Sequence, residues 1–358
     1  MHSTSLPQTS QYTSKVVVSG FDGYIDRILR VKQSKDQFFS TLDEFGQYIK
    51  DKAQKSCSLE LKPMAEKIGG NMPIFSLALA KLGVPVKCIG ALGFPAPHPL
   101  FQNMDANCQL HSVCNPGRCQ ALEFDDGKLM LADNEEIECL DFPLLLDRIG
   151  KEALVSLYES SSLIALLNWS ELSGSLSIWN GLKDEIFPLL SPQNRLAFID
   201  LSDCSGRSVQ DIQQACELIR GFSNCFDLTV SLNRNEAEIL AQALGVCYDS
   251  FESLTGQLQD RLQCARLVIH MLDCSYFIHR ESVQRRENFH VTHPVISTGG
   301  GDNFNAGFAY GLLQELPIMD CVDLAHYVSG FYVSHGWSPS RNELDQWIEH
   351  LKNNHPAY

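Results

Sequence analysis

The most informative stretch of the sequence is Ser297–Phe308, which reads STGGGDNFNAGF. It follows a strand-like run, and Asp302 stands where a helical pattern begins. Glycines permit positive φ and close backbone approach, and successive amides at a helix start can bind an anion. From these residues alone, two interpretations are open: a tight turn with Asp302 as a helix cap, or a phosphate-binding loop. Other phosphate loops fit worse, because GxxxxGK[ST] is absent and Phe304 replaces the last glycine of GxGxxG.

The pattern around this stretch predicts the fold class. Expected strands are Val16–Phe21, Val86–Gly90, Leu163–Trp169, Ala197–Leu201, Leu228–Leu232, Leu267–Leu272 and Tyr276–His279. Expected helices are Ile74–Leu82, Phe142–Ser160, Ser175–Leu190, Val209–Phe222, Arg234–Leu244 and Asn303–Leu313. Continuous apolar strands that alternate with helices predict an α/β fold, with a mostly parallel sheet covered by helices on both faces.

Two segments interrupt this alternation. Lys35–Ser56 has apolar residues at helical spacing among mixed charges, which predicts an added surface helix. Ala121–Phe124 and Leu129–Leu131 flank an Asp-Gly pair, which is a hairpin signal. We expect a small β lid from parts of residues 22–66 and 108–135, on a single domain spanning 15–350. A flexible segment, 1–14, should precede this domain, and a tail, 351–358, should follow it.

Composition excludes several classes of partner. The 358 residues include 28 Lys and Arg against 43 Asp and Glu, a net charge of −15. So acidic a chain is not expected to bind nucleic acid or an anionic membrane. Thirteen cysteines without a CxxC pair, no apolar run of about 18 residues and no signal-peptide pattern predict a reduced, cytoplasmic protein. His290 and His293 form an HxxH pair without a third ligand, so we expect no zinc site there.

The glycine-rich stretch resembles a known family signature. Gly299–Gly307 is similar to the second signature of the ribokinase-like (PfkB-type) carbohydrate kinases, a Gly-Ala-Gly-Asp loop followed by an aromatic-containing helix. The resemblance implies a three-layer α/β/α ribokinase-like fold. It also implies that Asp302 is the general base and that Gly299, Gly300 and Gly301 form the anion hole. The chemistry agrees, since phosphoryl transfer needs positioning, charge stabilisation and one base.

Two further segments resemble the sugar side of this family. Lys67–Asn71, which reads KIGGN, is similar to the first signature and implies that Gly69, Gly70 and Asn71 lie against the sugar. Val18–Asp26 resembles the first strand and its sugar-binding aspartate. Asp26 is the preferred match and Asp22 the second, although Asp22-Gly23 is equally typical of a turn.

Arg118 lies just before the expected hairpin and is a candidate contact for a sugar or phosphate oxygen. A solvated residue at the rim is the more ordinary role for such an arginine.

The nucleotide side has a weaker signature. Asn233-Arg234-Asn235-Glu236 follows a strand and matches the family's Asn-x-x-Glu, which implies binding of Mg²⁺ through its waters and of the phosphates. A helix cap with Glu at the third position explains the same residues. Asn305 joins this nucleotide- and Mg-binding group. Asp200 and Asp203 also end a strand, where ligand and capping roles are equally open.

The sequence departs from the family in places. The loop with Gly336 and Ser340 resembles one that surrounds a monovalent cation, but Ile296 stands where potassium-activated members have an aspartate. We therefore do not expect potassium activation. Leu272 occupies the place of the glycine in Thr-x-Gly beside the nucleotide, so the donor contacts are expected to differ.

The resemblance implies transfer of the γ-phosphoryl group of ATP to a hydroxyl of a small carbohydrate, with Mg²⁺. ADP as the donor, a nucleoside as the acceptor, and an inactive sugar- or nucleotide-binding protein stay open as alternatives. Lids of this family pair across dimers, so a homodimer is a further expectation. Because the loop carries no Lys or Arg, we expect a strong Mg²⁺ requirement.

Overall fold

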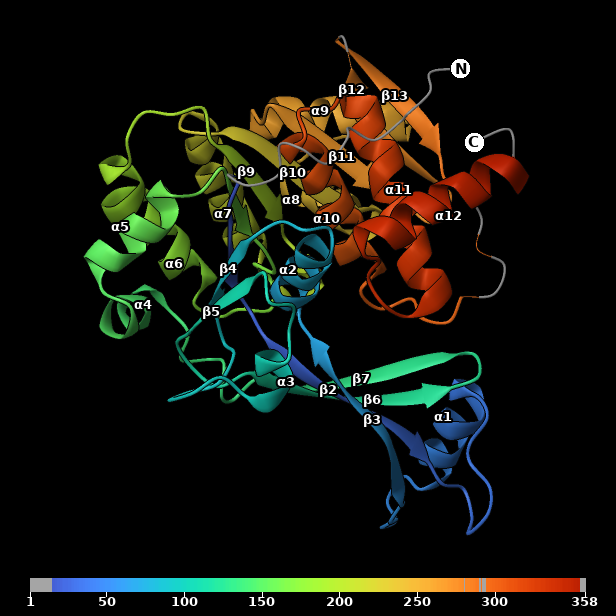
Figure 1. Cartoon of the computed structure of the whole chain (residues 1–358). Helices are drawn as coiled ribbons and strands as arrows, with labels where there is room; N and C mark the ends of the chain where they lie inside the picture. Colours follow the sequence, from blue (N-terminus) through green and yellow to red (C-terminus); the bar gives the residue numbers. More distant parts are fainter. Residues whose placement is uncertain (1–14, 280, 290, 292–293, 355–358) are drawn as a thin grey trace.

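The computed structural model describes residues 15–279, 281–289, 291 and 294–354, and the expected histidine pair at 290 and 293 lies outside this part. Two sheets organise these residues. The larger has the strand order β13-β12-β11-β10-β9-β8-β1-β4-β5, and the smaller, called the small sheet below, has the order β3-β2-β6-β7. Figure 1 shows the larger sheet inside a body of helices, with the small sheet projecting from one end.

Seven neighbouring strands of the larger sheet run parallel, and two antiparallel strands extend it at one edge. The parallel strands are β5 Cys108–Ser112, β4 Val86–Gly90, β1 Val17–Phe21, β8 Leu163–Leu166, β9 Leu196–Asp200, β10 Asp227–Asn233 and β11 Arg266–His270. The antiparallel strands are β12 Cys274–His279 and β13 Ser282–Glu287. β1 and β8 are buried throughout because helices cover both faces, as continuous apolar strands predict.

The helices form a layer on each face. One layer contains α4 Phe142–Arg148, α5 Lys151–Glu159, α6 Ser175–Gly181, α7 Val209–Ser223, α8 Arg234–Ala243 and α9 Phe251–Leu262. The other contains α2 Asn71–Lys81, α3 Pro99–Gln102, α10 Gly300–Leu313, α11 Ile318–His335 and α12 Arg341–Asn354. β9 supplies both cores in turn: Ala197 and Ile199 pack into the first layer and Phe198 into the second. The predicted three-layer α/β/α fold is therefore confirmed.

The small sheet consists of β2 Tyr24–Val31, β3 Leu61–Gly69, β6 Gly117–Phe124 and β7 Gly127–Asp133. β6 and β7 form the predicted hairpin, which turns at Asp125-Asp126. The predicted surface helix is α1 Leu42–Asp51, which packs with Phe39 against Leu29 and Leu122. These two leucines face each other in the register, so α1 covers one face of the small sheet and leaves the other free.

Two expected helices are interrupted. Phe142–Ser160 is divided into α4 and α5, because Gly150 adopts a φ of 87° that ends one helix and starts the next. Ser175–Leu190 is regular only over α6 and continues as a π turn and a 3₁₀ turn. Pro188 lies in the 3₁₀ turn, where its missing N–H prevents a regular helical bond.

Two expected boundaries also differ. The strand expected to run to Trp169 ends at Leu166, and Asn168 beyond it has a φ of 54°. At the C-terminal end, α12 continues to Asn354 and Leu351 is buried in the core. The folded part therefore extends beyond the domain end expected at residue 350.

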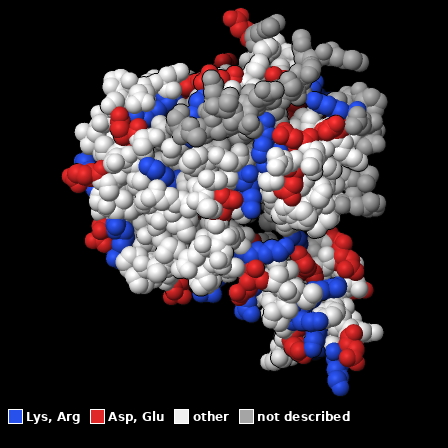
Figure 2. Space-filling view, in the orientation of Figure 1, with Lys and Arg blue, Asp and Glu red and all other residues white. Residues whose placement is uncertain are grey.

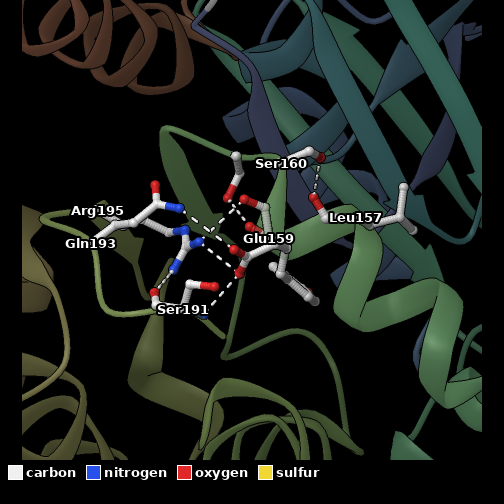
Figure 3. A network of polar contacts seen from close by, with 8 residues as sticks. Leu157, Glu159, Ser160, Ser191, Gln193 and Arg195 are labelled. Carbon is white, nitrogen blue, oxygen red and sulfur yellow. Dashed lines mark hydrogen bonds and ion pairs between the residues drawn. The ribbon is translucent and has the colours of Figure 1, made fainter. Parts of the chain in front are cut away.

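A network of polar contacts lies at the edge of the larger sheet where its parallel strands begin, opposite to their carboxyl ends (Figure 3). Arg195, whose side chain is 3% exposed, donates to the carbonyls of Ser191 and Glu159, at 3.1 Å each, and to the Glu159 carboxylate at 2.8 Å. These bonds hold the segment before β9 against the end of α5. Within the described part, no helix is both long and apolar enough to cross a membrane.

Candidate active site

The carboxyl ends of the parallel strands meet the start of α10 at one edge of the larger sheet, and the small sheet lies beyond that edge (Figure 1). Parallel α/β sheets place their ligands at this edge. Asp302 is the third residue of α10, because the helix begins at Gly300 rather than at the expected Asn303. Gly299 is the cap, so the interpretation of Asp302 as a helix cap is wrong.

The Asp302 carboxyl is nearly enclosed, with 9% of the residue exposed. Burial and the negative fields of Asp200, Asp22 and Glu236 raise its pKa well above the usual range. Among the described residues, no other side chain donates a hydrogen bond to it. An unpaired buried carboxyl with a raised pKa is suited to accept a proton from a substrate hydroxyl.

The backbone before Asp302 has no room for side chains. Gly299 has a φ of 89°, and a Cβ atom there would lie 2.7 Å from the hydroxyl oxygen of Tyr332. That hydroxyl donates to the carbonyl of Thr298 at 3.0 Å, and Ser329 donates to the carbonyl of Gly300 at 2.9 Å. Tyr332 and Ser329, both on α11, thus hold two carbonyls of the loop by hydrogen bonds. The amides of the loop lie at the start of α10.

The paired glycines Gly69 and Gly70 also have specific neighbours. A Cβ at Gly69 would lie 2.4 Å from Oδ1 of Asp26, and one at Gly70, where φ is 90°, would lie 2.7 Å from Oδ2 of Asp22. The structure therefore brings these residues together with Asn71, which starts α2 immediately afterwards. Any other residue at either glycine would displace a carboxylate.

The two aspartates differ in what they bind. Asp22 is fully buried and accepts from the first two amides of α2, at 2.7 and 2.8 Å, and from Nδ2 of Asn168 at 2.7 Å. Burial raises the pKa of Asp22 to about 7 despite these bonds. Asp26 receives no side-chain hydrogen bond from the described residues, and burial raises its pKa to about 6. Asp22 thus shapes the loop, whereas Asp26 keeps its oxygens available.

Asp200, the last residue of β9, makes hydrogen bonds to side chains of α10 and α2 at this edge. Its carboxylate accepts from Nδ2 of Asn305 at 2.6 Å, from the amide of Ser202 at 2.9 Å and from the side chain of Asn71. Asn305 in turn accepts a 2.6 Å bond from the hydroxyl of Ser231. Burial raises the pKa of Asp200 to about 6. The sequence left the role of Asp200 open, because its partners come from distant segments.

Asn233 and Glu236 form a capping box at the start of α8. Asn233 donates to both carboxylate oxygens of Glu236, at 2.8 and 2.6 Å, and its Oδ1 accepts the Glu236 amide at 3.0 Å. Burial and the nearby Asp200 raise the pKa of Glu236 well above its usual range. The cap interpretation is therefore correct, and the same carboxylate belongs to the buried acidic group around Asp302.

This arrangement suits Mg²⁺ better than a fully ligated metal. In the described part of the chain, no three His, Cys, Asp or Glu side chains gather as a ready ligand set. Mg²⁺ retains several waters and is held by one or two carboxylates together with substrate phosphates. Glu236 and Asp200, buried and close to each other, fit this donor set.

The sheet register separates Arg118 from Asp26. Arg118 pairs with Ile25 and Asp133, whereas Asp26 pairs with Cys119 in the neighbouring row. Adjacent residues of a strand point to opposite faces. Arg118 therefore lies on the face opposite to Asp26, and its side chain is exposed.

Lys128 of β7 is a cation near this site that no sequence motif indicated. Its Nζ lies 3.4 Å from Oγ1 of Thr298, directly before the glycine loop. From the sequence, this lysine was only the end of a hairpin turn. No local signal shows which part of the chain the hairpin covers.

Comparison with known proteins agrees with this geometry. The family model for prokaryotic ketohexokinase matches residues 3–351. The chain belongs to this family. A ketohexokinase from Haloferax volcanii is 28% identical over 335 residues, which are 92% of this chain and 89% of that protein. This prokaryotic ketohexokinase-family member is therefore a sugar kinase, a phosphotransferase with an alcohol group as acceptor, and the predicted ribokinase-like identity is confirmed.

Solved structures confirm the fold of this ketohexokinase-family chain. Adenosine kinase from Sinorhizobium meliloti superposes with a TM-score of 0.68 and 16% identity, over 96% of this chain and all of that one. Ribokinase from Thermotoga maritima gives 0.62 and 15%, over 94% of this chain and 99% of that one. At such identities the likeness concerns the fold alone.

The remaining predicted residues of this family member have local structural roles. Gly336 ends α11 with a φ of 88°. The hydroxyl and the amide of Ser340 donate to the Glu343 carboxylate at 2.6 and 2.7 Å, at the start of α12. Ile296 donates its amide to the carbonyl of Val333 and offers no carboxylate.

His270 is a buried residue next to the glycine loop. His270 ends β11, its ring lies 4.8 Å from that of Phe304, and its Cε1 would be 3.4 Å from a Cβ at Gly301. Burial lowers the pKa of His270 to about 4, so the ring is neutral. Leu272 is 96% exposed and adds no contact to the site.

Proposed function

We propose that this sugar kinase transfers the γ-phosphoryl group of ATP to a hydroxyl of a ketohexose. The observation that carries this proposal is the buried, unpaired Asp302 in the first turn of α10, directly after the backbone of Gly299–Gly301. The similarity to the ketohexokinase of Haloferax volcanii supports the choice of sugar.

In the proposed reaction, Asp302 removes the proton of the acceptor hydroxyl as its oxygen attacks the γ-phosphorus. The amides of Gly299–Gly301 stabilise the charge on the transferred group. Asn233 and Glu236 would hold Mg²⁺ and the phosphates. Asn305 would contribute through its hydrogen bond to Asp200. Bound Mg²⁺ supplies positive charge to the phosphates.

Asp26 with Gly69, Gly70 and Asn71 positions the sugar in this proposal. Carboxylate oxygens accept hydrogen bonds from sugar hydroxyls, and Asp26 has both of its oxygens available. The small sheet acts as a lid that excludes water and limits hydrolysis of the nucleotide. We place the reaction in the cytoplasm, where ATP and the reduced cysteines would both be found.

We also propose that two copies pair through the small sheet. Met64, Met130 and Leu131 on this sheet are 53%, 43% and 48% exposed, and the neighbouring residues Met130 and Leu131 point to opposite faces of β7, so apolar surface is available on both faces. Sedimentation of the wild type against a Met64→Lys, Leu131→Lys variant tests this pairing. A monomeric wild type would contradict it.

A coupled assay of ADP and AMP production tests the proposed reaction. Ketohexoses, aldohexoses, pentoses and nucleosides are compared as acceptors, with ATP and ADP supplied separately. We expect the highest kcat/KM with ATP and a ketohexose such as fructose, and no turnover when EDTA removes Mg²⁺. Preference for a nucleoside would overturn the acceptor, and AMP as the product would overturn the donor.

A further inference from the structure

We propose that Lys128 is a catalytic cation, carried by the small sheet, that contacts the transferred phosphoryl group. The inference rests on the proposed function, since it assumes that the acceptor lies at Asp26 and the phosphoryl group at Gly299–Gly301. It adds a residue that the sequence signatures do not contain.

The sheet register directs Lys128 toward the site. Lys128 pairs with Glu123 near the hairpin turn, and four residues further along β7 Ala132 pairs with Cys119, the neighbour of Asp26. Positions an even number apart on a strand share a face. Lys128 therefore projects from the face that carries Asp26, opposite to the face that α1 covers.

One contact and one electrostatic effect locate the ammonium group. Nζ lies 3.4 Å from Oγ1 of Thr298, the residue before Gly299. Burial raises the pKa of Asp26, and the positive charge of Lys128 acts in the opposite direction against this larger effect. The ammonium thus lies beside the loop that would bind the phosphoryl group, and its charge acts on the carboxylate that would bind the acceptor. A hollow of about 420 Å³ between the hairpin and residues 295–298 leaves room beside it.

The charge balance of the site calls for such a cation. Asp22, Asp200, Glu236 and Asp302 are all buried nearby, and residues 296–307 include no Lys or Arg. Figure 2 shows basic side chains where the small sheet meets the body. A positive group aimed at the transferring phosphoryl oxygens stabilises the transition state in a water-excluded site.

Lys128 keeps its protons throughout the transfer step and forms no covalent bond to the reactants. The acceptor oxygen forms a bond to the γ-phosphorus, and its proton passes to the Asp302 carboxylate. The bond between the γ-phosphorus and the bridging oxygen breaks, and ADP leaves with that electron pair. Lys128 donates hydrogen bonds to the oxygens of the moving phosphoryl group throughout.

A surface ion pair is the simpler role for Lys128. Its Nζ lies 3.6 Å from the carboxylate of Glu123, whose side chain is 39% exposed, and exposed pairs of this kind contribute little stability. If that pair were the whole role, loss of either partner would have the same effect. Glu123→Gln is therefore the matched control, because it breaks the pair and keeps the cation.

The test measures kcat and sugar KM for Lys128→Met, Lys128→Arg, Glu123→Gln and Lys32→Met, with MgATP and fructose. Lys32 directly follows β2 and forms a 2.5 Å ion pair with Glu60, which directly precedes β3, so it controls for loss of a lysine beside the small sheet. We expect Lys128→Met to lower kcat at least about tenfold with a KM within about threefold of the wild type. Lys128→Arg should retain part of kcat, because the charge remains. Glu123→Gln and Lys32→Met should stay within about twofold of the wild type.

Three outcomes would overturn the role of Lys128, two from the kinetics of Lys128→Met and one from the Glu123→Gln control. One is a kcat for Lys128→Met equal to that of Lys32→Met, and the other is a raised KM with unchanged kcat, which would make Lys128 a sugar ligand. Equal losses in Lys128→Met and Glu123→Gln would likewise reduce it to an ion pair. Asp302→Asn in the same series tests the proposed function separately, since full activity there would contradict the base and not the cation.

Discussion

The side-chain amide of Asn305 donates a 2.6 Å hydrogen bond to the carboxylate of Asp200, and this bond joins α10 to the end of β9. The hydroxyl of Ser231, on β10, donates a hydrogen bond to the side-chain oxygen of Asn305, so the three residues form one network. All three residues are buried. The position of the helix that carries Asp302 is therefore fixed by polar contacts beneath it as well as by packing.

Asn305→Ala should destabilise the protein by about 1–3 kcal/mol, because it leaves both the buried Ser231 hydroxyl and the Asp200 carboxylate without this partner. Chemical denaturation followed by circular dichroism measures the change. Ser231→Ala is the control, since it removes only the outer bond and should cost about 1 kcal/mol. Equal losses in the two variants would show that the Asp200 contact contributes nothing.

Asp302→Asn should lower kcat about a hundredfold or more, the contribution expected of a positioned general base. The melting temperature should not fall, because the change removes a buried carboxyl that receives no hydrogen bond from another side chain among the described residues. Steady-state kinetics and thermal unfolding are measured on the same preparation. Turnover at the wild-type rate would exclude Asp302 as the base.

Asp26→Asn should alter the pH dependence of stability and abolish sugar binding. A carboxyl whose pKa is higher in the folded chain binds more protons when folded. Its stabilising contribution is complete below the unfolded pKa of about 4 and is lost as the pH rises through about 6. At pH 7.5 the variant should therefore be more stable than the wild type by about 1–2 kcal/mol.

Urea denaturation from pH 4 to pH 7.5 measures this difference. The exposed Asp36, on the connection that follows β2, gives the control variant Asp36→Asn, which should follow the wild-type curve. An Asp26→Asn curve parallel to that of the wild type would show that Asp26 has no raised pKa.

Gly69→Ala should raise the sugar KM about tenfold or more, because its Cβ would lie 2.4 Å from Asp26 and would displace that carboxylate. Gly46→Ala on α1 is a matched control, since a Cβ there meets nothing within 4 Å and alanine favours the helix. Kinetics with varied sugar and varied nucleotide separate the effects. The nucleotide KM should stay near the wild-type value, and an unchanged sugar KM would place the sugar elsewhere.

The sequence predicted strands that are continuous apolar runs and several helices with a recognisable start or an apolar stripe. Val209–Phe222 agrees with α7 to within one residue, because Ser208 caps an amphipathic stretch. β3 was not expected, since seven of its nine residues are exposed and Pro63 breaks any strand pattern. α11 was also missed, because it is buried on most sides and so lacks an apolar stripe.

The site was predicted where chemistry and local motif coincide, as at Asp302 and the glycines. Asp200 and Lys128 could not be found in this way. Asp200 acquires its role from Asn305, 105 positions away, and Lys128 from Thr298, 170 positions away. Only the folded chain brings these pairs together.

Two of the four connections between the small sheet and the body contain residues that would bind the acceptor. β1 continues into β2 through Asp22-Gly23, and β3, which ends at Gly69, continues into α2 through Gly70. The other two connections are residues 113–116 and 134–141. A rotation of the small sheet would use these connections as its hinge, Asp22-Gly23 and Gly69-Gly70 among them. A substitution there that alters sugar preference also alters the hinge, so selectivity and the rate of closing are expected to change together.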